Sequence, residues 1–123
     1  MKKMAPIKRG DVVLVDLPFV QDFTKSKKRP VLVIQNNLGN RHSSNTIVLA
    51  ISSQPPHKTY PIHYKIYIKT PAGKASGLKK DSIVQAELIL TIPQKLISKK
   101  LGSLPESAMN EIEQRIKISL GIK

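Results

Sequence analysis

The 123-residue sequence contains no cysteine and only 8 aspartates and glutamates. Without cysteine the chain can form no disulfide, no thiolate zinc site and no cysteine nucleophile. So few carboxylates leave little material for a metal site built from several acidic side chains. The three histidines, His42, His57 and His63, show no metal-ligand spacing to one another or to a carboxylate. We therefore expect a protein without a bound metal or cofactor.

Aromatic residues are also scarce, at 4% of the chain, and tryptophan is absent. A nucleic-acid site built on many stacking rings is therefore disfavoured relative to contacts through Lys, Arg and the backbone. The apolar run Val12–Val15 is shorter than the core of a signal peptide, which has about 7–15 residues. No stretch approaches the roughly 20 apolar residues of a membrane-spanning helix. We expect a cytoplasmic protein with no membrane partner.

What the chain has in excess is positive charge: 21 Lys and Arg against 8 acidic residues give a net charge of +13. Residues 1–61 carry 10 basic and 3 acidic side chains (+7), and residues 62–123 carry 11 and 5 (+6). The folded body itself is thus basic, and it should attract nucleic acid, an anionic membrane surface or an acidic protein. The length predicts a single domain over residues 1–123.

Five short β-branched segments, separated by pieces rich in Gly, Pro and Asn, predict an all-β barrel or sandwich. In the fourth segment the alternation places His63 on the polar face with Lys65, opposite Ile62 and Tyr64. Turns are expected at Asn36–Asn40, Gln54–His57 and Thr70–Gly73. The five segments are Asp11–Leu17, Pro30–Asn36, Thr46–Ser52, Ile62–Lys69 and Ser82–Leu90.

The C-terminal part predicts one amphipathic helix over residues 104–120. Ser103 and Glu106 have the spacing of a capping box, and Gly121 is a natural stop. Before the helix, a helical turn at Gln94–Ile97 followed by a short edge strand fits the sequence. The apolar positions of the helix are Ala108, Met109, Ile112, Ile116 and Leu120.

Three places could carry chemistry. The basic run Lys25–Pro30 ends with Arg29 at a strand start, where its guanidinium could fork across two phosphate oxygens. Alternatively, the run is a solvated basic loop. Ser52–Gln54 place two hydroxyls and an amide at a strand end, where they could bind a phosphate or a base edge, although the residues by themselves favour a plain turn. Glu87 shares a strand face with Gln85 and is either a base-edge acceptor or general base, or the partner of a surface lysine.

Several segments together resemble the MazF/PemK toxins of type II toxin–antitoxin systems. The resemblance covers almost the whole chain in order. It rests on Lys8–Phe19, with its Arg-Gly-Asp start, on Lys28–Gln35, with its Arg-Pro pair, and on Ile47–Ser52, Leu101–Glu106 and Ile118–Gly121.

The resemblance implies an SH3-like small β-barrel with a C-terminal helix, which forms a homodimer. It also implies a sequence-selective, metal-independent endoribonuclease that cleaves single-stranded RNA, and an acidic antitoxin that covers the RNA groove. By position, the catalytic Arg of the family matches Arg29, and its hydroxyl residue at the end of the third strand matches Ser52. Arg29 would neutralise the charge on the phosphate, and Ser52 would orient it. RNA binding is expected of Lys27, Lys28, Ser53, Gln54 and Glu87.

Two alternatives remain open at this point. Leu88 and Leu90 stand where many members of the family have Gln and a basic residue. This departure suits a basic barrel that binds RNA or DNA without cutting it, or a module with degenerate activity that only receives an antitoxin. The residues alone name no general base.

Overall fold

The computed structural model describes residues 6–16, 28–54 and 60–123. These residues form six strands, three α-helices and one 3-10 turn. In chain order they are β1 (Asp11–Asp16), β2 (Lys28–Val33), α1 (Asn37–His42), β3 (Asn45–Ser52), β4 (His63–Ile66), α2 (Pro71–Ser76), β5 (Ser82–Pro93), η1 (Gln94–Leu96), β6 (Ile97–Ser103) and α3 (Glu106–Leu120).

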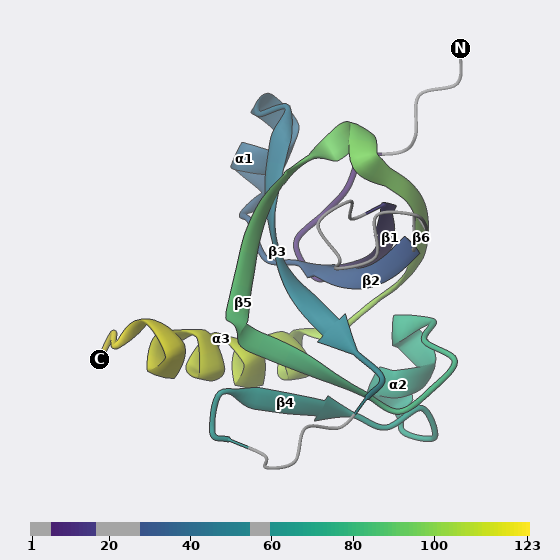
Figure 1. Cartoon of the computed structure of the whole chain (residues 1–123), viewed down its shortest axis with the longest axis vertical. Helices are drawn as coiled ribbons and strands as arrows, with labels where there is room; N and C mark the ends of the chain where they lie inside the picture. The colour runs from purple at the N-terminus through teal and green to yellow at the C-terminus, as the bar shows by residue number, and fades with distance from the viewer. Residues whose placement is uncertain (1–5, 17–27, 55–59) are drawn as a thin grey trace.

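The six strands form one antiparallel sheet in the order β4-β5-β3-β2-β1-β6. β5 continues through η1 directly into β6 at the far edge, so the sheet curls round on itself (Figure 1). The mainly-β class with a C-terminal helix is therefore confirmed. Within the described residues the curled sheet has two edges, β4 and β6, which are not paired with each other.

β5 is interrupted by a large bulge. Leu49 of β3 faces Ile89, whereas the next residue, Ala50, faces Gln85, so Ala86–Leu88 have no partner on β3. Extra residues on one strand bend it and break the alternation of its side chains. The predicted continuous face through Gln85, Glu87 and Ile89 is therefore wrong, because Glu87 lies inside the bulge.

The central strands are apolar on both faces because each face packs against its own core. Val12, Leu32 and Leu49 belong to the core that α3 covers with Met109 and Ile112. Alternate residues of the same strands point the other way. They form a second core, lined by Val13, Val15, Val31, Val33 and Val48.

The predicted C-terminal helix is present, but its capping box is wrong. The N-cap position is Pro105, which has no side-chain cap bond. The Ser103 hydroxyl instead donates to Asp11 Oδ1 at 2.9 Å. Asp11 is 2% exposed, and a buried carboxylate needs such donors more than a helix end open to solvent does. Gly121 ends the helix, as expected, and does so in the left-handed conformation. The helical turn and edge strand that fitted the sequence after Pro93 are present, as the 3-10 turn η1 and as β6.

Two of the predicted turns contain short helices, α1 and α2. Asn36 caps α1 by accepting from Gly39 N at 2.7 Å, and Thr70 caps α2 by accepting from Gly73 N at 3.1 Å. The same polar residues that favour turns also cap helices, so composition alone could not separate the two outcomes.

α2 is packed backbone to backbone against β6. Gly77, which ends α2, has φ +74°, and a Cβ there would lie 2.1 Å from the carbonyl oxygen of Leu101. Gly73 is equally close to its neighbours, because a Cβ would meet the Tyr67 carbonyl oxygen at 2.0 Å. Helix α2 is therefore held tightly against both β6 and the segment that follows β4.

We expect Gly77→Ala to destabilise the protein by clearly more than Gly121→Ala. A left-handed φ costs a non-glycine residue about 1–2 kcal/mol, and both glycines have positive φ. Only Gly77 adds the clash with Leu101, because nothing lies within 4 Å of a Cβ at Gly121. Urea unfolding of both variants measures the difference, and equal losses would contradict the close packing of α2.

Candidate active site

Most of the predicted site residues surround one cavity of about 610 Å³ at the ends of β2 and β3. Lys28, Arg29, Ser52, Ser53 and Gln54 line it, as do two residues that sequence reasoning missed, Pro30 and Ile51. Lys27 lies outside the described residues. Their positions on the two strands could have indicated these residues, because Pro30 directly follows Arg29 and Ile51 directly precedes Ser52.

The register of β2 and β3 brings Arg29 and Ser52 to the same end of the strand pair. Val31 faces Ala50 in the last paired position, and Arg29 and Ser52 lie two residues further along their respective strands. Side chains two residues apart on a strand point to the same face of the sheet, so both project on the side of Val31 and Ala50. The backbone of Arg29 is held by β1, where it faces Val15, and that of Ser52 by β5, where it faces Ile83.

Arg29 keeps an unused hydrogen-bond donor. Its Nε atom is buried and has no hydrogen-bond partner among the described residues, and the same holds for Asp16 Oδ1 at the end of β1. A buried donor left unpaired costs about 1–3 kcal/mol. A guanidinium held in this way is preorganised for an acceptor that arrives with a ligand.

Ser52 and Gln54 form a tight polar turn at the end of β3. The Ser52 hydroxyl accepts from Gln54 N at 3.1 Å and lies 3.2 Å from the Gln54 carbonyl oxygen, to which it donates. This turn leaves the side chains of Ser53 and Gln54 exposed at the mouth of the cavity. The alternative interpretation as a plain turn describes the local backbone, but the turn also borders the cavity of Arg29.

The described lining is basic. It carries Lys28 and Arg29 and no acidic side chain. An anionic group would therefore meet two positive charges and several hydroxyl or amide groups within one hollow, which suits a phosphate.

The comparisons with known proteins decide the family. The model of the PemK-like, MazF-like toxins of type II toxin–antitoxin systems matches residues 8–120. A curated relative, Endoribonuclease MazF of Staphylococcus epidermidis, is 40% identical over 116 residues, which is 94% of this chain and 92% of the relative. The chain belongs to the MazF/PemK family. The predicted family membership is thus confirmed.

Solved structures of MazF/PemK-type proteins share the fold. An endoribonuclease in complex with its cognate antitoxin from Mycobacterial species has a TM-score of 0.75 at 23% identity, covering 95% of this chain and 97% of that one. MazF from Deinococcus radiodurans, crystal form I, has a TM-score of 0.73 at 18% identity, covering 97% and 100%. At these identities the likeness supports the curled sheet with its C-terminal helix.

In this MazF/PemK chain Glu87 does not line the Arg29 cavity. Its Oε2 atom lies 3.0 Å from Nε2 of His63. His63 lies on the predicted face of β4, which it shares with Lys65, but it is buried there, with 6% of its surface exposed. The bulge in β5 brings a carboxylate to the ring, and Tyr60 N donates to Nδ1 at 3.3 Å, so both ring nitrogens are satisfied. The partner of Glu87 is thus a histidine rather than a surface lysine.

The described residues contain no group of three or more His, Asp or Glu side chains that could hold a metal ion. Among the same residues, no helix is long and apolar enough to cross a membrane.

Proposed function

We propose that this MazF/PemK-family endoribonuclease cuts single-stranded RNA at selected sequences, without a metal ion, through attack of the 2′-hydroxyl on the neighbouring phosphodiester. One observation carries the proposal. Arg29 and Ser52 each lie two residues beyond the last paired position of β2 and β3, and both line one basic cavity. We assign catalysis to these two residues and RNA binding to Lys27, Lys28, Ser53, Gln54 and Glu87.

Arg29 suits the charge that develops during this reaction. As the 2′-oxygen bonds to phosphorus and the bond to the 5′-oxygen breaks, negative charge builds on the non-bridging oxygens. A guanidinium stays protonated and can donate two parallel hydrogen bonds to them. The unpartnered Nε of Arg29 leaves such a donor available without breaking another bond among the described residues.

Ser52 suits the orientation of the phosphate. Its oxygen is held in place by the N–H of Gln54, and its one hydrogen can turn from the Gln54 carbonyl oxygen to a phosphate oxygen, so Ser52 can donate to the phosphate without a change of side-chain rotamer. Ser53, Gln54 and Lys28 surround the same hollow and can bind the sugar, base edges and flanking phosphates.

The proton transfers need a group beyond the described lining. One proton leaves the 2′-hydroxyl and one must reach the 5′-oxygen, giving a 2′,3′-cyclic phosphate and a 5′-hydroxyl. An arginine stays protonated at neutral pH and is a poor base, and no carboxylate or imidazole is among the residues that line the cavity. The carboxyl group next to the cavity lining in the strand register is that of Asp16, which faces Lys28 across β1 and β2.

We also propose the partners that the family implies. A cognate antitoxin with an acidic segment would compete with RNA for this basic cavity, as one solved neighbour is an endoribonuclease bound to its cognate antitoxin. The toxin would act as a homodimer of single-domain chains, residues 1–123, in the cytoplasm.

The test is cleavage of a long single-stranded RNA in the presence of EDTA. We expect the wild-type protein to cut at a short recurring sequence, and Ser52→Ala to reduce the rate strongly. Ser52→Thr should retain most activity, because it keeps the hydroxyl. An absolute requirement for a divalent ion would overturn the metal-free mechanism, and a gel shift without products would indicate a binding module.

A further inference from the structure

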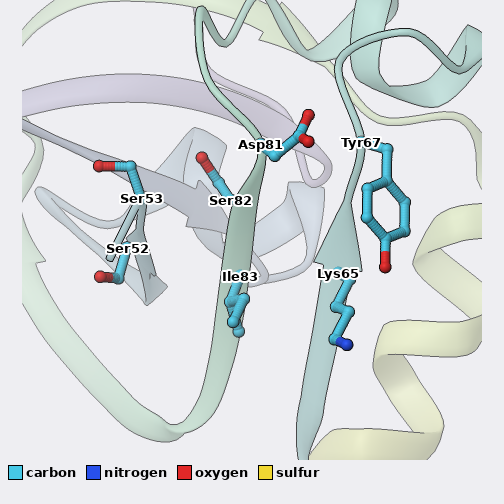
Figure 2. Close-up of a pocket in the computed structure, with 7 residues that line it drawn as sticks. All are labelled: Ser52, Ser53, Lys65, Tyr67, Asp81, Ser82 and Ile83. Atoms are coloured by element: carbon cyan, nitrogen blue, oxygen red, sulfur yellow. The ribbon is translucent and has the colours of Figure 1, made fainter. Parts of the chain in front are cut away.

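Three more hollows continue outward from the Arg29 cavity. The first, of about 280 Å³, shares Ser52 and Ser53 with it (Figure 2). The second, of about 460 Å³, shares Tyr67 and Asp81 with the first. The third, of about 320 Å³, shares Ser53 with the Arg29 cavity and two lysines with the second hollow. Each of the four hollows therefore adjoins at least one of the others.

The strand register explains why the first hollow adjoins the Arg29 cavity. Ser52 of β3 faces Ile83 of β5, and Ile83 in turn faces Lys65 of β4. Ser52, Ile83 and Lys65 therefore make one row across three neighbouring strands, and their side chains project from the same side of the sheet. At about 4.8 Å per strand, Lys65 lies roughly 10 Å along the row from Ser52, which lines the cavity of Arg29.

The second and third hollows carry an excess of lysines, and the first adds one more lysine beside them. We call Lys65, Lys69, Lys79 and Lys80, all of which are exposed, the lysine track. Within the described part of the chain none of these four lysines takes part in an ion pair. The acidic residue beside them, Asp81, uses Oδ1 to accept from the backbone N of Ile68 at 2.9 Å. Four neighbouring positive charges repel one another, and a polyanion relieves that repulsion.

An exposed tyrosine ring lies beside the lysine track. Tyr67 is 50% exposed and borders both the first and the second hollow (Figure 2). Its carbonyl oxygen accepts from Thr70 N at 3.0 Å and from the Thr70 hydroxyl at 2.6 Å, and Gly73 of α2 packs directly on it. The backbone under the ring is therefore rigid, which favours stacking of a flat group.

We propose that the lysine track and Tyr67 bind nucleotides of the RNA strand that flank the cut bond. The inference rests on the proposed function and adds that the protein binds a longer stretch of its RNA substrate than the cut sequence alone. Phosphates lie along Lys65, Lys69, Lys79 and Lys80, and one base stacks on Tyr67. Alternating cations and an exposed ring suit a single-stranded nucleic acid, whose phosphates and bases alternate in the same way.

The test compares short and long substrates. The cut sequence is first read from the products of the wild-type protein, which tests the proposed function by itself. Affinities are then measured for two 2′-O-methyl oligonucleotides, which lack the attacking hydroxyl. One covers only the cut sequence, and the other extends it on both sides.

We expect the double variant Lys79→Ala/Lys80→Ala to bind the long oligonucleotide roughly tenfold more weakly and the short one almost unchanged. Its salt dependence for the long oligonucleotide should fall by about 1.4 in the slope of log affinity against log salt, because each phosphate contact on a single strand contributes about 0.7. The control Lys95→Ala/Lys117→Ala removes two exposed lysines outside the four hollows and should leave the slope unchanged.

Tyr67→Leu, which keeps an apolar side chain, should weaken the long oligonucleotide by about tenfold through lost stacking. Two outcomes would overturn the proposal while the enzyme still cuts RNA. In one, the lysine-track variant and its control bind the long oligonucleotide equally well. In the other, the lysine-track variant binds both oligonucleotides like the wild type and loses binding only to a polyglutamate peptide. That result would show that the surface binds an acidic protein segment.

Discussion

Arg29→Ala is expected to lower the rate of RNA cleavage by about 10²–10³-fold. Removal of one preorganised donor to a developing oxyanion has an effect of this order in enzymes. Arg29 combines a permanent charge with a backbone position held by β1, in a cavity that it shares with Ser52. The measurement is the initial rate of cleavage of a long single-stranded RNA in EDTA.

Arg29→Lys should stay well below the wild-type rate, because an ammonium keeps the charge but loses the two parallel hydrogen bonds. Arg41→Ala is the matched control, since it removes an exposed guanidinium from α1, away from the cavity lining. Thermal unfolding should show that Arg29→Ala remains folded. Cleavage at the wild-type rate by folded Arg29→Ala protein would refute the catalytic assignment.

Ile112→Ala should reduce the free energy of unfolding by about 2–5 kcal/mol. Ile112 has 0% of its surface exposed and lies where α3 packs on the core formed by Val12, Leu32 and Leu49. The truncation leaves a cavity that the surrounding strands cannot close, since they are held in register by their neighbours. The loss should appear as a fall in melting temperature of roughly 10 °C or more.

Ile118→Ala provides the control for this prediction. It makes the same substitution on the same helix, but Ile118 is 55% exposed. Its effect should stay within about 0.5 kcal/mol. Equal destabilisation by the two variants would show that burial under α3 does not dominate the stability of the fold.

Local pattern was a good guide to the main elements and a poor one to their ends and faces. The apolar segments became strands, and the spacing from Ala108 to Leu120 became α3. The Ser103 hydroxyl, in contrast, goes to buried Asp11 rather than to a helix end. His63 is buried because a bulge in the neighbouring strand, β5, supplies Glu87 as its partner. Each of these outcomes depends on a residue distant in sequence.

The candidate site was likewise predictable only in part. The residue types of Arg29 and Ser52 and their resemblance to the MazF/PemK pattern pointed to phosphate chemistry. Whether the two share a cavity depends on the register of β2 and β3, which no local pattern reveals. Glu87, assigned from the same resemblance, stands with His63 instead of lining that cavity.

By itself, the sequence determined the composition-level properties and the periodic elements: the net charge of +13, the lack of cysteine, the strands and the final helix. These depend on residue identity and on contacts between near neighbours along the chain. Only the tertiary structure decided how that charge is distributed, with Arg29 and Lys28 in one cavity and four lysines continuing from it around Tyr67. The physical reason is that strand pairing and the backbone contacts of Gly73 and Gly77 bring together residues that are remote in sequence.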